Sequence, residues 1–121
     1  MRLHEAIRLG AMNKPQGRGS FNSAWGTCAI GAALDAVGLL SKEQVNMATA
    51  VRQWPVLDKY IQHPRCNLAY IQPLRMTIVE LNDVHGWTRE RIAEGLQPIE
   101  ETYEASRLAL TDDEHDKTHV S

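Results

Sequence analysis

The sequence predicts an all-α fold, a compact single-domain bundle of about five to six helices around a central helix of small residues. Three observations favour this fold. The chain has 121 residues, the size of one domain. Its apolar residues recur at intervals of three and four, whereas strand-like alternation is weak throughout. The hydrophobic fraction of 43% is enough to build a core. We expect residues 1–110 to form the domain and residues 111–121 to be an acidic, disordered tail.

The first helix is expected over residues 2–11. Leu3, Ile7 and Ala11 recur at helical spacing and would form its buried side. Residues 13–26 then form a long loop rich in Gly, Asn and Ser. A loop of this length inside a small domain more often serves a function than merely joins two helices.

The second helix is the central one, with Thr27 as its predicted N-cap and Gly38 at its end. An apolar stripe runs along one side of it, formed by Ile30, Leu34 and Val37. A nearly flat face lies beside the stripe and consists of Cys28, Gly31, Ala32 and Asp35. So little side chain lets either a neighbouring helix or a ligand approach closely, and the sequence leaves these two alternatives open.

The third helix is expected to begin at Ser41, which can form a capping box with Gln44, and to stop at Pro55. A short helix over residues 56–62 and a turn over residues 63–67 follow.

Two further helices complete the predicted bundle. One spans Pro73–Asp83, with its proline at the first helical position. The next is capped by Thr88. Because Gly95 and Pro98 interrupt its apolar pattern, we expect a kink, or two helices meeting, near Gln97.

The charge distribution excludes some function classes. Residues 1–110 carry 12 Lys plus Arg against 11 Asp plus Glu, a sum of +1, whereas residues 111–121 carry one Lys against four Asp plus Glu, a sum of −3. A nearly neutral body argues against sequence-independent DNA binding, which needs a dense basic surface, and we expect no sequence-specific nucleic-acid partner. No stretch approaches the roughly 18 apolar residues that a membrane span requires. The first residues lack the apolar run of a secretory signal, so we expect a cytoplasmic protein.

The loop before the small-residue helix is a candidate anion site. Helix N-termini present unpaired N–H groups, and glycines allow a phosphate to approach. The candidate ligand-binding residues are Arg18, Phe21, Trp25, Thr27, Asp35, Asn82 and Asp83. The alternatives are that the loop aromatics pack into the core and that the Asn-Asp pair serves only turn and capping chemistry. Asp35 is the odd charge on the small-residue face, and it needs a polar partner if it is buried.

Metal and thiol chemistry have a weaker basis. His63 and Cys66 have the spacing of half a zinc site, which Cys28, His85 or Asp83 could complete. Only one half-site is present, so we predict neither a metal nor another cofactor. Cys28 could also act as a nucleophile with His85 as its base, although a small buried cysteine explains the sequence equally well.

Two segments together resemble a family of small uncharacterised bacterial and phage proteins. The first is Cys28-Ala29-Ile30-Gly31-Ala32-Ala33, a Cys-x-Leu/Ile-Gly-Ala motif. The second is Leu81-Asn82-Asp83 followed by Trp87-Thr88-Arg89-Glu90-Arg91-Ile92-Ala93. The resemblance covers about residues 2–100 and implies a bacterial or phage setting rather than a reaction. Where some relatives are expected to carry Cys-Pro-x-Cys, this chain has His63-Pro64-Arg65-Cys66.

These observations predict a non-enzymatic binding module, encoded by a phage or mobile element, that binds a small anionic ligand such as a nucleotide or a host protein, in a counter-defence role. Association with a second copy of the chain is left open. The alternative is a thiol- or metal-dependent enzyme that uses Cys28 or the His63/Cys66 pair.

Overall fold

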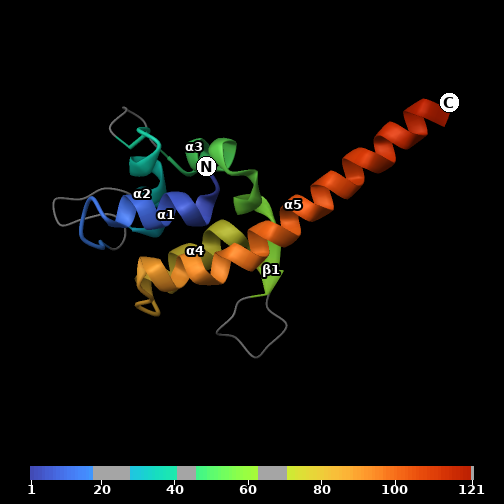
Figure 1. The fold of residues 1–121 in the computed structure, drawn as a ribbon. Helices are drawn as coiled ribbons and strands as arrows, with labels where there is room; N and C mark the ends of the chain where they lie inside the picture. The colour runs from blue at the N-terminus through green and yellow to red at the C-terminus, as the bar shows by residue number, and fades with distance from the viewer. Residues whose placement is uncertain (18–27, 41–45, 63–70, 121) are drawn as a thin grey trace.

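The computed structural model describes residues 1–17, 28–40, 46–62 and 71–120, and in the last range it describes side chains only as far as residue 108. The described part is mostly helical (Figure 1). Its elements are α1 (Leu3–Ala11), α2 (Ala29–Ala36), α3 (Met47–Gln53), the 3-10 helix η1 (Pro55–Asp58), β1 (Tyr60–Gln62), β2 (Ile71–Pro73), α4 (Leu74–Asp83) and α5 (Arg89–Val120). A helical domain is therefore confirmed, although the small two-stranded sheet departs from an all-α fold.

Helices α1 and α2 pack against each other at very short range. Gly10 of α1 faces the backbone of Ala32 in α2, and a Cβ added to Gly10 would overlap the Ala32 carbonyl group. Both residues are buried, and Ala32 is 0% exposed. The space beside the small-residue face of α2 is thus filled by a neighbouring helix, which resolves the alternative that the sequence left open.

The ends of α2 differ in part from the prediction. Its N-cap is Cys28, not Thr27: the backbone at Cys28 is extended and its Sγ accepts a hydrogen bond from the Gly31 N–H at 3.3 Å. Thr27 lies outside the described residues. Gly38 follows the last turn with φ +75°, a conformation that glycine adopts without strain, and it ends the helix as predicted.

The segment between α2 and α4 is where sequence and structure differ most. Helix α3 begins at Met47, with Asn46 in an extended conformation as its N-cap. The predicted start at Ser41 and its capping box with Gln44 lie outside the described residues. The short helix predicted over residues 56–62 is instead the 3-10 helix η1 followed by strand β1. Strand β1 pairs with β2 in antiparallel register, with Ile61 opposite Gln72. Strands of three residues are too short to show an alternating pattern in the sequence.

Helices α4 and α5 lie close to their predicted positions. Pro73 is the N-cap of α4 rather than its first residue, and Oγ1 of Thr88 caps α5 by accepting from the Arg91 N–H at 3.1 Å. Helix α5 is one helix of 32 residues that runs through Pro98, so the alternative of two helices meeting near Gln97 is wrong, whereas the predicted kink stays a prediction. Apolar residues on both sides of Pro98 pack against the same core, and this packing holds the helix together where one backbone hydrogen bond is lost.

The C-terminal half of α5 extends away from the rest of the molecule (Figure 1). The backbone of residues 111–120 is helical there. The disorder predicted for this acidic segment stays a prediction.

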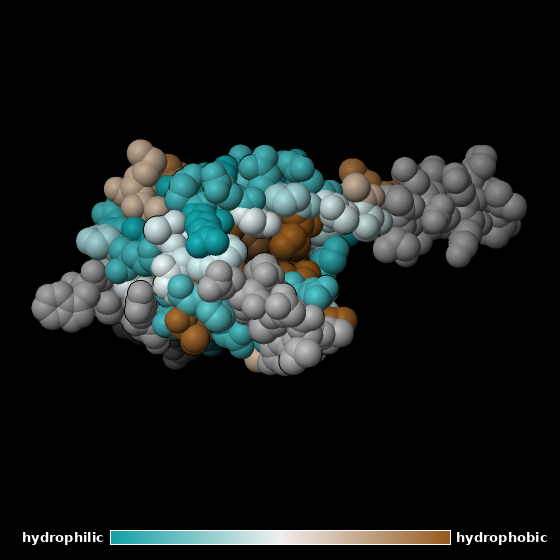
Figure 2. Space-filling model, turned by 90° about the horizontal axis from the view of Figure 1, so that it is seen from below, coloured by the Kyte–Doolittle hydropathy of each residue, from teal (hydrophilic) through white to brown (hydrophobic). Residues whose placement is uncertain are grey.

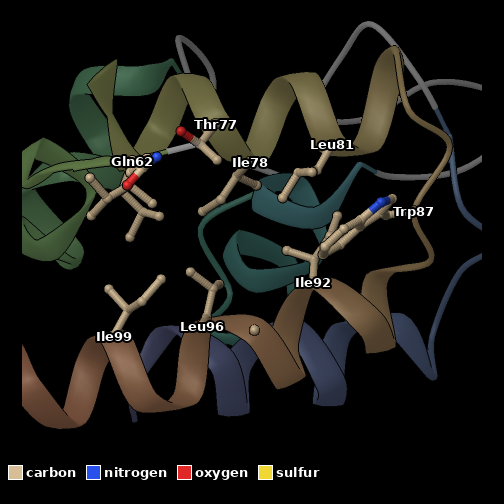
Figure 3. Close-up of a pocket in the computed structure, with 11 residues that line it drawn as sticks. Gln62, Thr77, Ile78, Leu81, Trp87, Ile92, Leu96 and Ile99 are labelled. Atoms are coloured by element: carbon tan, nitrogen blue, oxygen red, sulfur yellow. The ribbon is translucent and has the colours of Figure 1, made fainter. Parts of the chain in front are cut away.

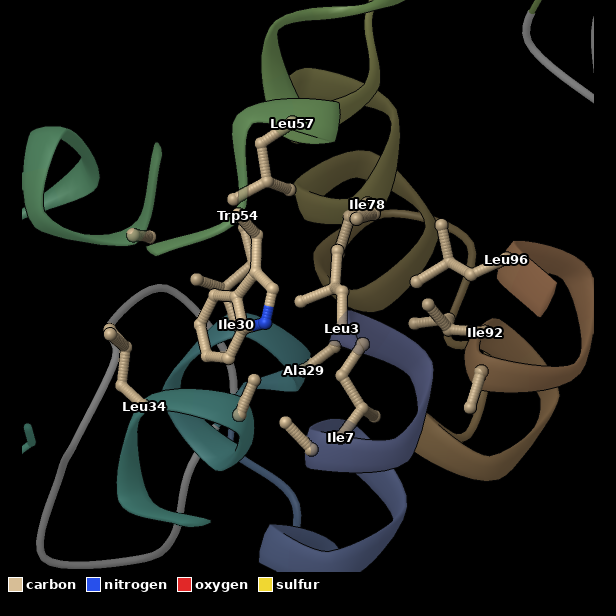
Figure 4. Close-up of a cluster of buried hydrophobic side chains, with 14 of the residues drawn as sticks. Leu3, Ile7, Ala29, Ile30, Leu34, Trp54, Leu57, Ile78, Ile92 and Leu96 are labelled. Atoms are coloured by element: carbon tan, nitrogen blue, oxygen red, sulfur yellow. The ribbon is translucent and has the colours of Figure 1, made fainter. Parts of the chain in front are cut away.

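One core joins all the α-helices and η1. Figure 4 shows Ile30 of α2 beside Trp54 and Leu3, with Ile78 of α4 and with Ile92 and Leu96 of α5 farther along the same cluster. Trp54 covers this cluster, and its Nε1 donates to the Met1 carbonyl at 3.1 Å. Leu3, Ile7 and the α2 residues Ala29, Ile30, Ala33 and Leu34 are all 0% exposed. The buried side predicted for the first helix is confirmed at Leu3 and Ile7.

A buried carboxylate on α5, that of Glu100, forms hydrogen bonds with the start of α1. Glu100 accepts hydrogen bonds from the backbone N–H groups of Leu3, at 2.9 Å, and His4, at 2.6 Å. It also contacts the His4 Nδ1 at 2.8 Å. Glu100 is 4% exposed, and it satisfies N–H groups that the first turn of α1 would otherwise leave unpaired.

Candidate functional site

An apolar pocket lies between α4 and α5, and we call it the α4–α5 pocket. Its lining residues come from β1, α4, the turn before α5, and α5: Ile61, Gln62, Leu74, Thr77, Ile78, Leu81, Trp87, Ile92, Gly95, Leu96 and Ile99. Figure 3 shows the side chains of α4 and α5 pointing toward one another, with Trp87 at one end of the space and Gln62 at the other. Figure 2 shows apolar surface gathered near the centre of one face of the molecule.

The pocket exists because one position of the α5 stripe lacks a side chain. Ile92, Leu96 and Ile99 follow at helical spacing, and Gly95 lies between them on the exposed side. A Cβ added at Gly95 would meet only Trp87 Cζ3, at 4.0 Å. The gap between the two helices is therefore left open at Gly95.

The chemistry of the pocket is that of an apolar receptor. Its volume is about 110 Å³. Most lining side chains are hydrocarbon, and the hydroxyl of Thr77 already accepts a hydrogen bond from Gln72 Nε2 at 3.0 Å. An apolar cavity of about 150 Å³ holds a benzene ring, whereas sites for drug-sized ligands usually exceed about 300 Å³. The α4–α5 pocket therefore fits one apolar side chain and is too small for a nucleotide.

A second, polar cluster lies where the end of α4 meets the chain after α1. Asn82 is 0% exposed; its Nδ2 donates to the Gly17 carbonyl at 2.9 Å, and its Oδ1 accepts from Gln16 Nε2 at 2.8 Å. Gln16 Nε2 also donates to the Trp87 carbonyl at 2.7 Å. These bonds attach residues 16–17 to the turn between α4 and α5. The structure thus shows Asn82 holding residues 16–17, a contact that the sequence did not predict, and its ligand-binding role stays a prediction.

Cys28, Asp83 and Arg89 lie near one another in this region. Burial raises the pKa of the Cys28 thiol, and the charge of Asp83 acts in the same direction, while the Gly31 N–H opposes them. Burial also lowers the pKa of Arg89, which is 8% exposed and donates to the Ala11 carbonyl at 3.4 Å. A raised pKa keeps Cys28 protonated and works against the nucleophilic role considered for it.

The other predicted ligand-binding residues separate into two groups. Arg18, Phe21, Trp25 and Thr27 lie outside the described residues, so the anion site stays a prediction. Asp35 is partly exposed, and its carboxylate lies 3.5 Å from Asn13 Nδ2 and 3.8 Å from Lys14 Nζ. Asp35 is therefore not the buried charge for which a polar partner was required, and Asn13 and Lys14 are its neighbours.

Metal ligation was considered from the sequence around His63 and Cys66, which lie outside the described residues. Within the part that is described, which includes Cys28, Asp83 and His85, no three His, Cys, Asp or Glu side chains are grouped to hold a metal ion. None of the helices described here combines the length and apolar character needed to cross a bilayer.

Comparison with protein families, curated proteins and solved structures found no match for this chain. The resemblance carried by the Cys-x-Leu/Ile-Gly-Ala motif therefore remains an expectation.

Two features of this region are not evident from the sequence. Gly95 predicts an interrupted helix, although a glycine inside the stripe of Ile92, Leu96 and Ile99 also signals a gap in a packed face. Arg89 is buried, and no local pattern shows that an arginine at a helix start will be buried.

Proposed function

We propose that this chain is a non-enzymatic binding module that recognises a protein partner by accepting one bulky apolar side chain in the α4–α5 pocket. The observation that supports the proposal is an open, almost wholly apolar pocket of about 110 Å³ whose lining has no side chain at Gly95. Open apolar surface on a small protein is a common mark of a protein-interaction site. The host protein expected from the sequence is the partner we propose, in the phage or mobile-element setting that the resemblance implies.

The energetics indicate what the pocket contributes. Full burial of one Leu or Phe side chain is worth about 1.5–3 kcal/mol. A micromolar complex requires about 8 kcal/mol. Burial of one side chain in the pocket therefore provides only part of the binding free energy. Contacts around the rim of the pocket must provide the rest of the affinity and the specificity.

The two other functions considered have less support. A small anionic ligand would need converging cationic or N–H donors, and the residues predicted to supply them are mostly in the undescribed loop. Thiol catalysis would need an accessible thiolate, but Cys28 is 8% exposed and its pKa is raised by burial. Of the two kinds of ligand predicted from the sequence, the described residues favour a protein.

The proposal is tested by filling the pocket. Tagged wild-type protein, Gly95→Leu and the control Gly95→Ala are each used to retain partners from a host lysate, after circular dichroism has verified that all three fold. We expect partners held by the wild type and by Gly95→Ala to be lost with Gly95→Leu. Equal retention by all three proteins would refute the proposal.

A thermal-shift screen with nucleotides tests the anionic alternative in parallel. A nucleotide at a hundred times its dissociation constant should stabilise the protein by about 2.7 kcal/mol. We expect no such shift. A nucleotide that stabilises the wild type and Gly95→Leu equally would favour the loop site over the pocket.

A further inference from the structure

Cationic groups lie at both ends of the α4–α5 pocket, which bears on the kind of partner that fits it. At one end, the Arg91 guanidinium stacks over the ring of the pocket residue Trp87, with its Cζ 4.0 Å from the ring centroid. Arg91 is exposed, and among the described residues it has no carboxylate within ion-pair distance. The contact with the Trp87 ring positions the Arg91 guanidinium, and its charge remains available to bind an anion.

The other end carries a second cation. Lys59 directly precedes β1, whose residues Ile61 and Gln62 line the pocket, and its Nζ lies 5.8 Å from the centroid of the Tyr103 ring. Tyr103 is one helical turn beyond the pocket residue Ile99 on α5. Within the described part, Lys59 also has no acidic side chain within 4.0 Å. Arg91 and Lys59 thus place one positive charge near each end of the α4–α5 pocket.

The neighbouring acidic groups do not neutralise these two cations. Most of them have other partners: Asp58 with Arg75, Glu90 with Arg8, Glu104 with Arg2, Glu101 with Gln97, and Glu80 with Gln72. Glu94 follows Arg91 by three residues on α5 and forms no ion pair with it among the described residues. The pocket thus has an apolar lining, and near each end lies one cationic side chain without an ion-pair partner among the described residues.

We infer that the partner segment is acidic and presents its apolar anchor between two carboxylates, an assignment that rests on the function proposed above. The twelve residue-to-residue steps from Arg91 to Tyr103 span roughly 18 Å of helix at about 1.5 Å per step. An extended peptide covers that length with about five or six residues. Carboxylates three positions on either side of a central Leu or Phe would therefore reach both cations while the anchor occupies the pocket.

The experiment uses three short synthetic peptides and the full chain labelled with ¹⁵N. The first has a central Leu with Glu at both ends, the second has the same Leu with Lys at both ends, and the third has the Glu ends with a central Ser. Binding is followed through the amide signals of pocket residues such as Gly95 and Leu96. We expect the first peptide to bind roughly tenfold more tightly than either of the others, because two exposed ion pairs and one buried side chain each contribute modestly. Raised salt should reduce the preference for Glu over Lys ends.

Charge-reversed variants test the assignment of the two cations. Lys59→Glu together with Arg91→Glu should reverse the preference, so that the peptide with Lys ends binds more tightly. The matched control is Arg52→Glu, which changes an exposed arginine on α3 outside the pocket and should leave the preference unchanged.

The outcomes separate this inference from the proposed function. If the two Leu peptides bind equally well and both are lost with Gly95→Leu, the acidic partner is refuted while the pocket proposal stands. If peptide binding is unaffected by Gly95→Leu, or if no peptide shifts the pocket signals, both are refuted. If the pocket signals shift with protein concentration alone and deletion of residues 111–121 abolishes that shift, the occupant is the acidic segment of a second copy and a separate partner is refuted.

Discussion

The backbone of Ala32 lies so close to Gly10 that a methyl group on residue 10 would stand 2.9 Å from the Ala32 Cα and overlap the adjacent carbonyl. Gly10→Ala should therefore force α1 and α2 apart. We expect a loss of about 2–4 kcal/mol in the free energy of unfolding, because the obstacle is backbone and cannot rotate away. Urea denaturation measures the change.

Gly95→Ala is the matched control for this prediction. It makes the same substitution inside a helix, but the added methyl group meets nothing closer than 4.0 Å. Alanine favours helix over glycine by about 1 kcal/mol, so this variant should be slightly more stable than the wild type. If both variants changed stability by the same amount, the close contact between α1 and α2 would be excluded.

The buried Glu100 carboxylate should be a major source of stability. Glu100→Gln replaces one accepting oxygen with an NH2 group, which cannot accept from the N–H group of Leu3 or His4. We expect a loss of roughly 2–3 kcal/mol, since a buried charge-assisted cap is lost and a donor faces a donor. Glu101→Gln changes the exposed neighbour and should alter stability by less than about 0.5 kcal/mol. Equal effects in chemical denaturation would contradict the role assigned to Glu100.

Asn82 should hold the segment after α1, residues 16–17, in its folded conformation. Asn82→Ala leaves Gln16 Nε2 and the Gly17 carbonyl without their Asn82 partner, at a cost of about 2–3 kcal/mol. Native-state hydrogen exchange should show faster exchange of the amides of residues 16–17. Asn46→Ala, which removes the exposed cap of α3, should cost about 1 kcal/mol without changing exchange in residues 16–17. Unchanged exchange in Asn82→Ala would contradict the prediction.

Cys28 predicts a pH dependence of stability. Its pKa in the folded chain is raised above the usual value of 9.0 by burial, so the stability linked to the protonated thiol is fully present below pH 9. As the pH rises above 9, the unfolded chain releases its thiol proton first, and this stability is lost. Cys28→Ser keeps a side chain that can cap α2 but does not titrate in this range.

The difference in unfolding free energy between wild type and Cys28→Ser should therefore move in favour of the variant between pH 8 and pH 10. Groups shared by both proteins, such as lysine and tyrosine, cancel in this comparison. A constant difference across the range would mean that the folded-state pKa of Cys28 is not raised.

Local patterns were sufficient for much of the helical fold. The stripe of Leu3, Ile7 and Ala11 predicted α1. Thr88 marked the start of α5 and Gly38 the end of α2, because capping depends on only a few neighbouring residues. The elements that failed were those with little local signal. Residues 60–62 pair with residues 71–73, which lie about ten positions later in the sequence, and only that pairing makes both segments strands.

The sequence by itself determined that α2 is small enough for very close approach, because the absence of side chains is a property of the residues. Only the tertiary structure decided that α1, through Gly10, fills that space, and that the open space lies elsewhere, beside Gly95. Both glycines lie within helices and look alike in the sequence. The difference between a tight contact and a pocket arises from which surface each one faces, and that depends on how distant helices pack.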